Sequence, residues 1–286
     1  MAIGRIPVGR LSALAAVVAG AFVLFTTTTG PRFREVKAGV EFATLRGDPY
    51  CRRGSSDIAV LRIDPRRVKI GVRHYSREPA GRPMSVVEWQ RATGAVAVFN
   101  AGQYYPDYSY MGLLVSGGRT VSRRLHAKFQ AALVASPHPR RGEKAADHGP
   151  MARVLDLQEE SLDPRAPGWK EVAQSFMLFD RLGTIRTRKS TQVANRTAVA
   201  EDRHGRIVVI TSEGAYTVWE FATLLKDWPL QLTHAMSMDG GLEAELCVAT
   251  EEFRYATFGH WPDGVETPDA PGAQVRLPAV VTVGSE

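Results

Sequence analysis

Apolar and polar positions alternate along most of the chain, and this pattern predicts β-strands. Residues 57–64 and 67–74 alternate well and are separated by an Asp-Pro turn, which predicts a hairpin. The clearest hairpin pairs residues 195–200 with residues 206–212. Further buried strands are predicted at residues 94–100, 112–119, 131–135, 174–180, 235–238 and 246–248. Residues 36–50 are predicted to be irregular or an edge strand.

Two capping-box sequences predict helices between the strands. Ser85–Glu88 starts a helix that stops near Gly94, and Thr217–Glu220 starts a second helix that ends at Pro229. Apolar residues of the second helix share one face. Many hairpins with few helices predict an α+β fold, with a mostly antiparallel sheet packed against two or three helices in a single domain. Residues 136–150 and 163–168 are predicted to be loops within that domain.

The N-terminal 30 residues differ from the rest of the chain. Arg5 and Arg10 precede a continuous apolar run from Leu11 to Phe25. A positive start followed by an apolar run of this length is typical of a signal peptide, and an uncleaved membrane anchor is the alternative. We therefore expect an exported protein, periplasmic or extracellular, whose functional domain covers residues 31–286.

Composition fits a globular protein of 286 residues, with 44% hydrophobic and 23% charged residues. The net charge of +6 comes largely from arginine, which clusters around residues 119–124 and 181–188. Such clusters bind phosphate or anionic glycans, or they are simply solvated faces. Acidic residues are interspersed and no nucleic-acid motif is present, so nucleic acid is not an expected partner.

The two cysteines fit an oxidising compartment. Cys51 and Cys247 either form a disulfide or are two separate buried thiols, and the apolar strand pattern around Cys247 favours thiols. The seven histidines show no metal-ligand spacing with each other or with the cysteines. The sequence therefore predicts no metal and no cofactor.

The stretch His234–Cys247 combines a short apolar run, Asp239, two glycines and a second apolar run. One interpretation is a ligand-binding strand end, since Gly240 and Gly241 allow positive φ and close approach of a ligand to the backbone. The other interpretation is a Gly-Gly hairpin turn with a turn-favouring aspartate.

Polar residues also stand where the other predicted strands end. Strand ends beside small residues often bind ligands, although amides and hydroxyls there commonly satisfy turns. Arg196 is the most informative of them, because a guanidinium beside an apolar strand needs an acidic partner or a bound phosphate. The strand-end residues of this kind are Asn100, Gln103, Gln174, Asn195, Arg196, Thr197, Thr211, Ser212, Glu213, Asp239 and Glu243.

An ordered set of these motifs resembles the phosphodiester glycosidase family, over about residues 57–250. The motifs are Phe99–Tyr104, Gly112–Arg119, Gln174–Phe179, Asn195–Val199, Asp202–Gly205 and Met238–Gly241. Bacterial members of this family are often described as exopolysaccharide biosynthesis proteins. The resemblance implies hydrolysis of the bond between an anomeric carbon and a phosphodiester oxygen.

The family's functional positions fall on Asn100, on Arg196 with Thr197, and on Asp239–Gly241. Two departures are visible. Leu242 and Glu243 follow the Asp-Gly-Gly motif in place of a small residue and serine, and Asn-Gly-Gly is replaced by Asn-Ala-Gly at residues 100–102.

We therefore expect Asp239 to act on the sugar, as nucleophile, base or hydroxyl ligand, and Arg196 to bind the phosphate. Glu213 and Glu243 are candidates for a second catalytic carboxylate. The predicted substrate-binding residues are Asn100, Gly102, Gln103, Gln174, Thr197, Gly240 and Gly241. The rival hypothesis is a non-catalytic envelope protein that binds an anionic polysaccharide through its arginines.

Overall fold

A computed structural model describes Met1 and residues 30–138, 151–260 and 274–284 of the chain. The predicted export segment and most of the predicted loop 136–150 lie outside these residues. The described residues from Pro31 to Gly284 form one compact unit. Among the described residues, no helix has the length and apolar character needed to cross a membrane.

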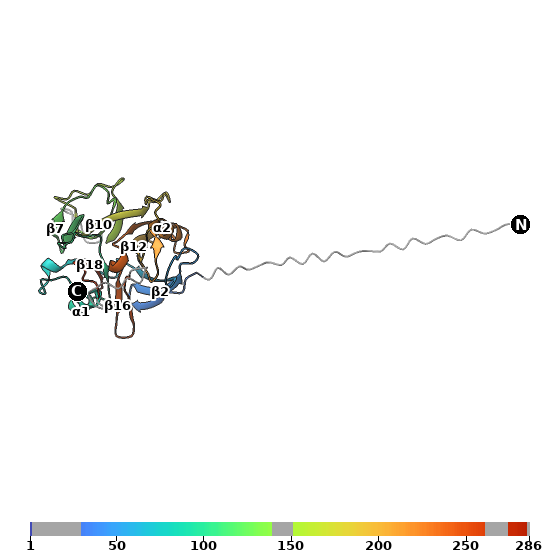
Figure 1. The fold of residues 1–286 in the computed structure, drawn as a ribbon, viewed down its shortest axis with the longest axis horizontal. Helices are drawn as coiled ribbons and strands as arrows, with labels where there is room; N and C mark the ends of the chain where they lie inside the picture. Colours follow the sequence, from blue (N-terminus) through green and yellow to red (C-terminus); the bar gives the residue numbers. More distant parts are fainter. Residues whose placement is uncertain (2–29, 139–150, 261–273, 285–286) are drawn as a thin grey trace. The chain divides into compact units, whose positions relative to one another are not determined.

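Most described strands belong to two antiparallel sheets (Figure 1). The 11-stranded sheet has the order β1 (Arg34–Lys37), β2 (Val40–Arg46), β3 (Asp57–Ile63), β13 (Ile207–Ser212), β12 (Thr197–Asp202), β15 (Leu232–Ser237), β10 (Trp169–Phe179), β6 (Leu113–Ser116) and β7 (Arg119–Arg123), with β8 (Ala131–Pro137) paired to β10 and β9 (Ala152–Asp156) paired to β8. The 5-stranded sheet has the order β17 (Arg254–Thr257), β16 (Leu246–Ala249), β5 (Ala97–Asn100), β18 (Ala279–Val283) and β4 (Ile70–His74).

Shorter elements complete the described part of the fold. They are a two-stranded sheet of β11 (Val193–Ala194) and β14 (Tyr216–Thr217), the helices α1 (Val86–Thr93) and α2 (Val218–Asp227), and the 3₁₀ turns η1 (Tyr75–Arg77) and η3 (Gly241–Glu243).

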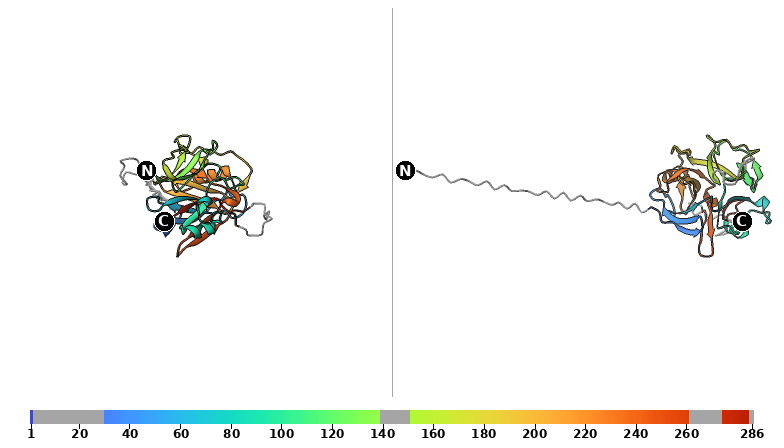
Figure 2. Two further views of the ribbon diagram at one scale, coloured as in Figure 1. Left: turned by 90° about the vertical axis from the view of Figure 1, so that its left-hand side faces the viewer. Right: turned by 180° about the vertical axis from the view of Figure 1, so that it is seen from behind.

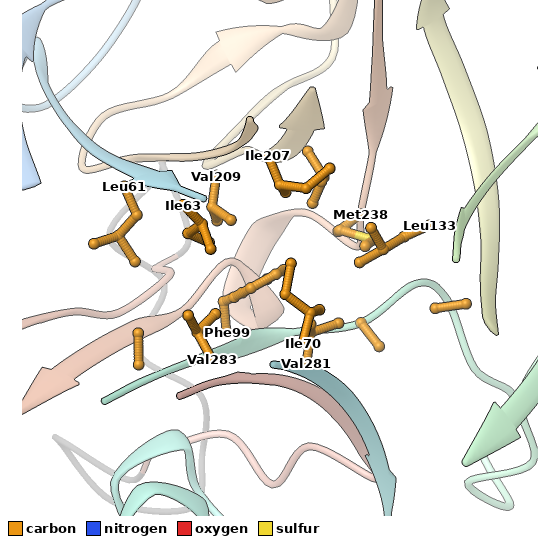
Figure 3. Packing of buried hydrophobic residues seen from close by; sticks show 14 of the residues in the cluster. Leu61, Ile63, Ile70, Phe99, Leu133, Ile207, Val209, Met238, Val281 and Val283 are labelled. Carbon is orange, nitrogen blue, oxygen red and sulfur yellow. The ribbon is translucent and has the colours of Figure 1, made fainter. Parts of the chain in front are cut away.

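The period-2 alternation of the strands explains how the two sheets share a core. In β13, Ile207 and Val209 face the second sheet, while Val208 and Ile210 face the other way. Figure 3 shows side chains of the large sheet, Leu61 and Ile63 among them, packed against the small sheet. The small sheet contributes Phe99, Val281 and Val283 to this core.

Each helix covers the outer face of one sheet. Phe221 and Leu225 of α2 pack on the large sheet, in the same cluster as Val208 and Ile210. Trp89 of α1 is fully buried in a cluster with residues of β5, β16 and β18. The layers therefore run α2, large sheet, small sheet, α1, which confirms the predicted α+β class (Figure 1).

Several local predictions are confirmed. The strand pair β6–β7 turns at Gly117 and Gly118, which both have positive φ, and β12 pairs with β13 as the predicted hairpin. Ser85 and Glu88 form both halves of a capping box. The region 36–50, predicted to be irregular or an edge strand, instead holds β2 between β1 and β3, and only the end of the edge strand β1 falls within it.

The predicted hairpin of residues 57–64 and 67–74 is wrong. Both segments form strands, but β3 belongs to the large sheet and β4 to the small one. Both edges of β3 are taken by β2 and β13, so β4 pairs with β18 instead. Alternation identifies a strand and its buried face but not its partner.

The second capping box is only half formed. The Thr217 hydroxyl accepts from the Glu220 backbone N–H at 3.2 Å, as predicted. The Glu220 carboxylate instead binds the Thr217 hydroxyl and the guanidinium of Arg52. The carboxylate is therefore held by side chains rather than by the backbone of the cap.

Both cysteines are free thiols, as their sequence context favours. Cys51 packs at the edge of the α2 cluster, whereas Cys247 is buried in the α1 cluster. The two lie on opposite outer faces of the paired sheets. Cys247 belongs to β16, which forms a hairpin with β17. The right-hand view of Figure 2 shows this hairpin from behind, at the bottom of the molecule.

Candidate active site

Strand ends from both sheets meet at Asp239, which follows β15. The Asp239 N–H donates to the Ala101 carbonyl at 3.0 Å, just beyond β5 of the small sheet. The Asn100 side chain donates to the Asp239 carbonyl at 2.9 Å. On the other side, the Met238 N–H donates to the Thr197 carbonyl at 2.8 Å, at the start of β12. These bonds bring segments near residues 100, 196 and 239 together.

The two glycines after Asp239 have separate reasons to be glycine. A Cβ on Gly240 would lie 2.9 Å from the Asn195 carbonyl oxygen and 3.3 Å from Nη1 of Arg196. Gly241 has a φ of +80° and starts η3, and its N–H donates to the Asn195 carbonyl. The Gly-Gly hairpin interpretation is therefore wrong, since β15 and β16 belong to different sheets.

A cleft of about 750 Å³ opens over this junction. Its lining comes from Gln103, from the segment between Ser237 and Glu243, from the segment 127–130, and from residues between Arg186 and Arg196. Its size suits a sugar together with a phosphate.

Two carboxyl groups, those of Asp239 and Glu243, line the cleft. Burial and the nearby charge of Glu243 raise the pKa of Asp239 to about 7, although the Gly240 N–H, Gln103 and Arg196 act against this rise. The pKa of Glu243 is also raised, mainly by burial. The Tyr104 hydroxyl donates to Glu243 Oε1 at 3.2 Å, which fixes that carboxyl group. At neutral pH Asp239 can therefore gain or lose a proton at little cost.

Arg196 places a guanidinium beside Asp239. Its Nε donates to the Tyr216 carbonyl at 3.0 Å and its Nη2 to the Gln192 carbonyl at 3.2 Å. Burial lowers the pKa of Arg196 to about 10, while the charge of Asp239 raises it. No described residue accepts a hydrogen bond from Nη1, which is the nitrogen next to Gly240. This nitrogen is free to donate to an anionic ligand.

Three more basic residues line the cleft. Lys128 and Arg188 line the cleft, and neither makes an ion pair within the described parts of the chain. Arg186 also lines the cleft, but it is held by two buried aspartates. Its Nε lies 2.8 Å from Asp180 and its Nη2 lies 3.2 Å from Asp156. The cleft is thus lined by carboxyl groups and by cations that no described carboxylate pairs with.

The predicted site residues divide into two groups. Those that line the cleft are Gln103, Arg196, Asp239, Gly240, Gly241 and Glu243. Those that do not are Asn100, Gly102, Gln174, Thr197 and Glu213. Glu213 accepts from the Tyr255 hydroxyl at 2.7 Å, away from the cleft lining.

The buried amides outside the cleft bind the segments that form it. Asn100 donates to the Asp239 carbonyl, and its own amide oxygen accepts from the Glu245 N–H. Gln174 holds the segment on both sides of Lys128 with three bonds. One comes from the His126 N–H, and two go to the carbonyls of His126 and Phe129. A fourth bond joins it to the Leu113 N–H.

Gly102 and Thr197 fill tight positions beneath the cleft. The Gly102 N–H donates to the Tyr110 hydroxyl at 3.0 Å, and a Cβ on Gly102 would lie 2.5 Å from that oxygen. The Thr197 hydroxyl lies 3.5 Å from that of Thr211, and both residues are fully buried. Neither residue lines the cleft.

Tyr104, Lys128 and Gln192 are cleft or near-cleft residues that sequence reasoning did not select. Tyr104 stands in the Phe99–Tyr104 motif, directly after Gln103, so its position in the sequence could have identified it as a site residue. Lys128 and Gln192 lie in segments without periodicity, and no local pattern marks them.

Within residues 30–138, 151–260 and 274–284, no three His, Cys, Asp or Glu side chains gather closely enough to hold a metal ion.

Glu245 lies behind the site with only 1% of its surface exposed. Burial raises its pKa to about 8, from an ordinary value of 4.5. Between these two pH values the folded protein keeps a proton that the unfolded chain releases, so the free energy of unfolding falls as pH rises. Its Oε2 atom has no hydrogen-bond partner in the described structure.

Glu245→Gln should therefore stabilise the protein at alkaline pH, on the order of 2–4 kcal/mol near pH 9. The gain should largely vanish near pH 4.5, where the wild-type carboxyl group is protonated in the folded state. Chemical denaturation at the two pH values measures it, with the exposed Glu252→Gln as control. A loss of stability at pH 9 would contradict this assignment.

Comparisons with known proteins show the family of this chain and agree with its fold. A family model described as phosphodiester glycosidase matches residues 93–281. The catalytic domain of zebrafish N-acetylglucosamine-1-phosphodiester alpha-N-acetylglucosaminidase, auto-inhibited by its pro-peptide, is similar in structure with a TM-score of 0.60 and 15% identity. That match covers 90% of this chain and 87% of the zebrafish chain.

A hypothetical protein from Synechocystis is similar with a TM-score of 0.55 and 14% identity, over 89% of this chain and 64% of that one. At these identities the structural likenesses show a shared fold. No curated protein sequence matches significantly.

Proposed function

Because the chain belongs to the phosphodiester glycosidase family, we propose that it hydrolyses the bond between the anomeric carbon of a sugar and a phosphodiester oxygen. The observation that carries this proposal is one cleft in which Asp239 and Glu243 lie beside the guanidinium of Arg196. Carboxyl groups suit a positively charged sugar centre, and a guanidinium suits a phosphate.

The proposed reaction has little need of a general acid. Water attacks the anomeric carbon, the bond from that carbon to oxygen breaks, and its electron pair leaves with the phosphate. The products are a free sugar and a phosphomonoester. Because the phosphate carries the departing charge well, the protein mainly needs to activate water, stabilise the oxocarbenium-like centre and bind the phosphate.

The residues divide these tasks. Asp239, in its ionised form, acts as base or nucleophile at the sugar. Nη1 of Arg196 donates to a phosphate oxygen, where it stabilises the charge of the leaving group. Glu243, held by Tyr104, is the second carboxyl group, and Gln103 orients Asp239.

The remaining predicted residues act indirectly. Asn100, Gln174 and Thr197 position the segments that carry the site, as does Gly102. Gly240 and Gly241 let the substrate approach the backbone beside Asp239. We place Glu213 outside the chemistry, because its carboxylate is bound to Tyr255.

The proposed substrate is an exported glycan or glycoconjugate, in the periplasm or outside the cell. The support is the positive start and apolar run of residues 1–30, which is typical of an export signal or membrane anchor. The sugar-phosphodiester substrate is an anionic ligand, in keeping with the unpaired Lys128 and Arg188 in the cleft.

The pH dependence of kcat/KM should follow the ionisation of Asp239. Its pKa is about 7, so kcat/KM should rise about tenfold per pH unit below pH 7 and level off above it. The plateau should last to about pH 9, because the pKa of Arg196 is about 10 and its charge persists to that point. Initial rates at low substrate concentration across this range measure the profile. A rate that falls as pH rises through 7 would mean that protonated Asp239 is the active form.

A panel of sugar 1-phosphodiesters tests the reaction type, with each product identified separately. The proposal predicts free sugar and phosphomonoester in equal amounts. Release of sugar 1-phosphate would instead mean that the other ester bond breaks. Binding of anionic glycans without turnover, unaffected by Asp239→Asn, would select the non-catalytic envelope protein.

A further inference from the structure

A second hollow, of about 630 Å³, adjoins the cleft. Ser190 and Val193 line both spaces, so the two spaces adjoin at the segment 190–193. Gln192 in this segment accepts a hydrogen bond from Arg196 at its carbonyl oxygen. The segment that Arg196 contacts therefore also borders the hollow.

Aromatic rings form part of this hollow. Tyr50 and Trp219 line it, and both are half-buried. Trp219 belongs to none of the hydrophobic clusters among the described residues, although Val218 and Phe221 on the same helix pack into the α2 cluster. An indole ring that is not needed for the core offers an apolar face to a ligand, such as the C–H face of a sugar.

The same hollow carries an excess of positive charge. Arg52, Arg53 and Lys189 line it, against the single carboxylate of Glu220. Arg52 is already bound to Glu220, which holds its guanidinium in place. Lys189 is exposed and makes no ion pair within the described part of the chain, and its Nζ lies 5.0 Å from the centre of the Trp219 ring.

Hydroxyl groups of Ser190 and Thr191 complete the lining, while those of Thr217 and Thr223, which also line it, donate to Glu220 and to the Trp219 carbonyl. Aromatic faces, hydroxyls and cations together match the apolar face, hydroxyl groups and negative charge of an acidic or phosphorylated sugar. A small diester that ended at the phosphate would leave this surface unused.

We propose that the hollow of Tyr50, Lys189 and Trp219 is a second subsite, which binds the next negatively charged sugar unit on the far side of the phosphate. This inference rests on the proposed function and narrows the substrate to an oligomer or polymer. In that substrate, sugar units are linked through phosphodiesters or carry acidic groups. The cleft then holds the sugar to be released, and Trp219 binds the chain that remains.

Calorimetric binding tests this subsite without depending on turnover. The probes are N-acetylglucosamine 1-(methyl phosphate) and a trimer of N-acetylglucosamine linked by 1,6-phosphodiesters. Both are titrated into Asp239→Asn protein, so that cleavage does not consume them. Trp219→Ala and Lys189→Ala are added on this background. The half-buried Trp169→Ala and the exposed Lys226→Ala serve as matched controls outside both spaces.

The subsite predicts that Trp219→Ala weakens trimer binding about 10-fold or more, and Lys189→Ala weakens it about threefold or more. Neither substitution should change the affinity for N-acetylglucosamine 1-(methyl phosphate) by more than about twofold. Equal weakening for both probes, or no weakening for the trimer, would overturn the subsite. Failure of the proposed function would appear elsewhere, as absence of sugar release by the wild-type protein, and would leave this difference in binding measurable.

Discussion

Asp239→Asn should lower kcat/KM by about 1,000-fold or more while leaving the thermal midpoint unchanged or slightly raised. The amide keeps the shape and the hydrogen bond from Gly240 but removes the charge that acts on the sugar. Stability should not suffer, because burial and Glu243 raise the pKa of Asp239 above its unfolded value. Ionised Asp239 therefore destabilises the folded state as pH rises toward 7 and above. Steady-state kinetics and thermal unfolding at about pH 8 measure both effects.

Asp227→Asn is the matched control, since Asp227 is an exposed carboxylate at the end of α2, paired with Lys226. It should change kcat/KM by less than about twofold. If Asp239→Asn unfolded the protein while activity per folded molecule stayed intact, Asp239 would be structural and the proposed mechanism would be wrong.

Arg186→Met should lower the free energy of unfolding by about 3–5 kcal/mol. The side chains of Asp156 and Asp180 are 2% and 5% exposed, and Arg186 is the cation that both contact. Burial raises the pKa of Asp180, but the bonds from Arg186 and from backbone N–H groups outweigh this and hold it below its ordinary value. Methionine would keep the length of the side chain and leave two buried carboxylates without their cation. Urea unfolding at about pH 7 measures the loss.

Arg153→Met is the control for that substitution. Arg153 makes two hydrogen bonds to a single carboxylate, that of Glu160. This pair is more exposed, with 25% of the Arg153 side chain and 34% of the Glu160 side chain accessible to solvent. Loss of such a pair should cost about 1 kcal/mol or less. Equal costs for the two arginines would contradict the view that Arg186 anchors the cleft wall through buried charge.

The strands and helices could be predicted because their signals are local. Ile207–Ile210 alternate between two faces, and the structure buries both faces, one against the small sheet and one against α2. The turn at Gly117 and Gly118 and the cap at Ser85 depend on residues a few positions apart. Such features follow from backbone geometry that neighbouring residues determine.

Which strands pair with each other, and in which sheet, could not be predicted in the same way. Residues 57–64 and 67–74 have hairpin-like patterns, yet they enter different sheets, since pairing depends on which distant strand occupies each edge. The same limit applies to the site. That Asp239 and Arg196 meet follows from backbone bonds of Met238 and Asp239 to Thr197 and Ala101.

The roles of individual polar residues could not be predicted from their places in the sequence. Gln174 and Asn100 looked like ligand donors because they stand at the ends of apolar strands. Each is almost fully buried, and the bonds of each go to neighbouring segments. Burial decides between the two uses of an amide, and a single sequence does not give the burial of one side chain. Lys128 was missed because a lone lysine in a loop carries no pattern.

Hydrolysis in ¹⁸O-labelled water tests the central claim most directly. Cleavage at the sugar carbon and cleavage at phosphorus can give the same sugar and phosphomonoester, so product identity alone does not locate the broken bond. If Asp239 directs attack at the anomeric carbon, mass spectrometry of a single turnover should find the label in the sugar and none in the phosphomonoester. Label in the phosphomonoester would mean attack at phosphorus and would contradict the mechanism.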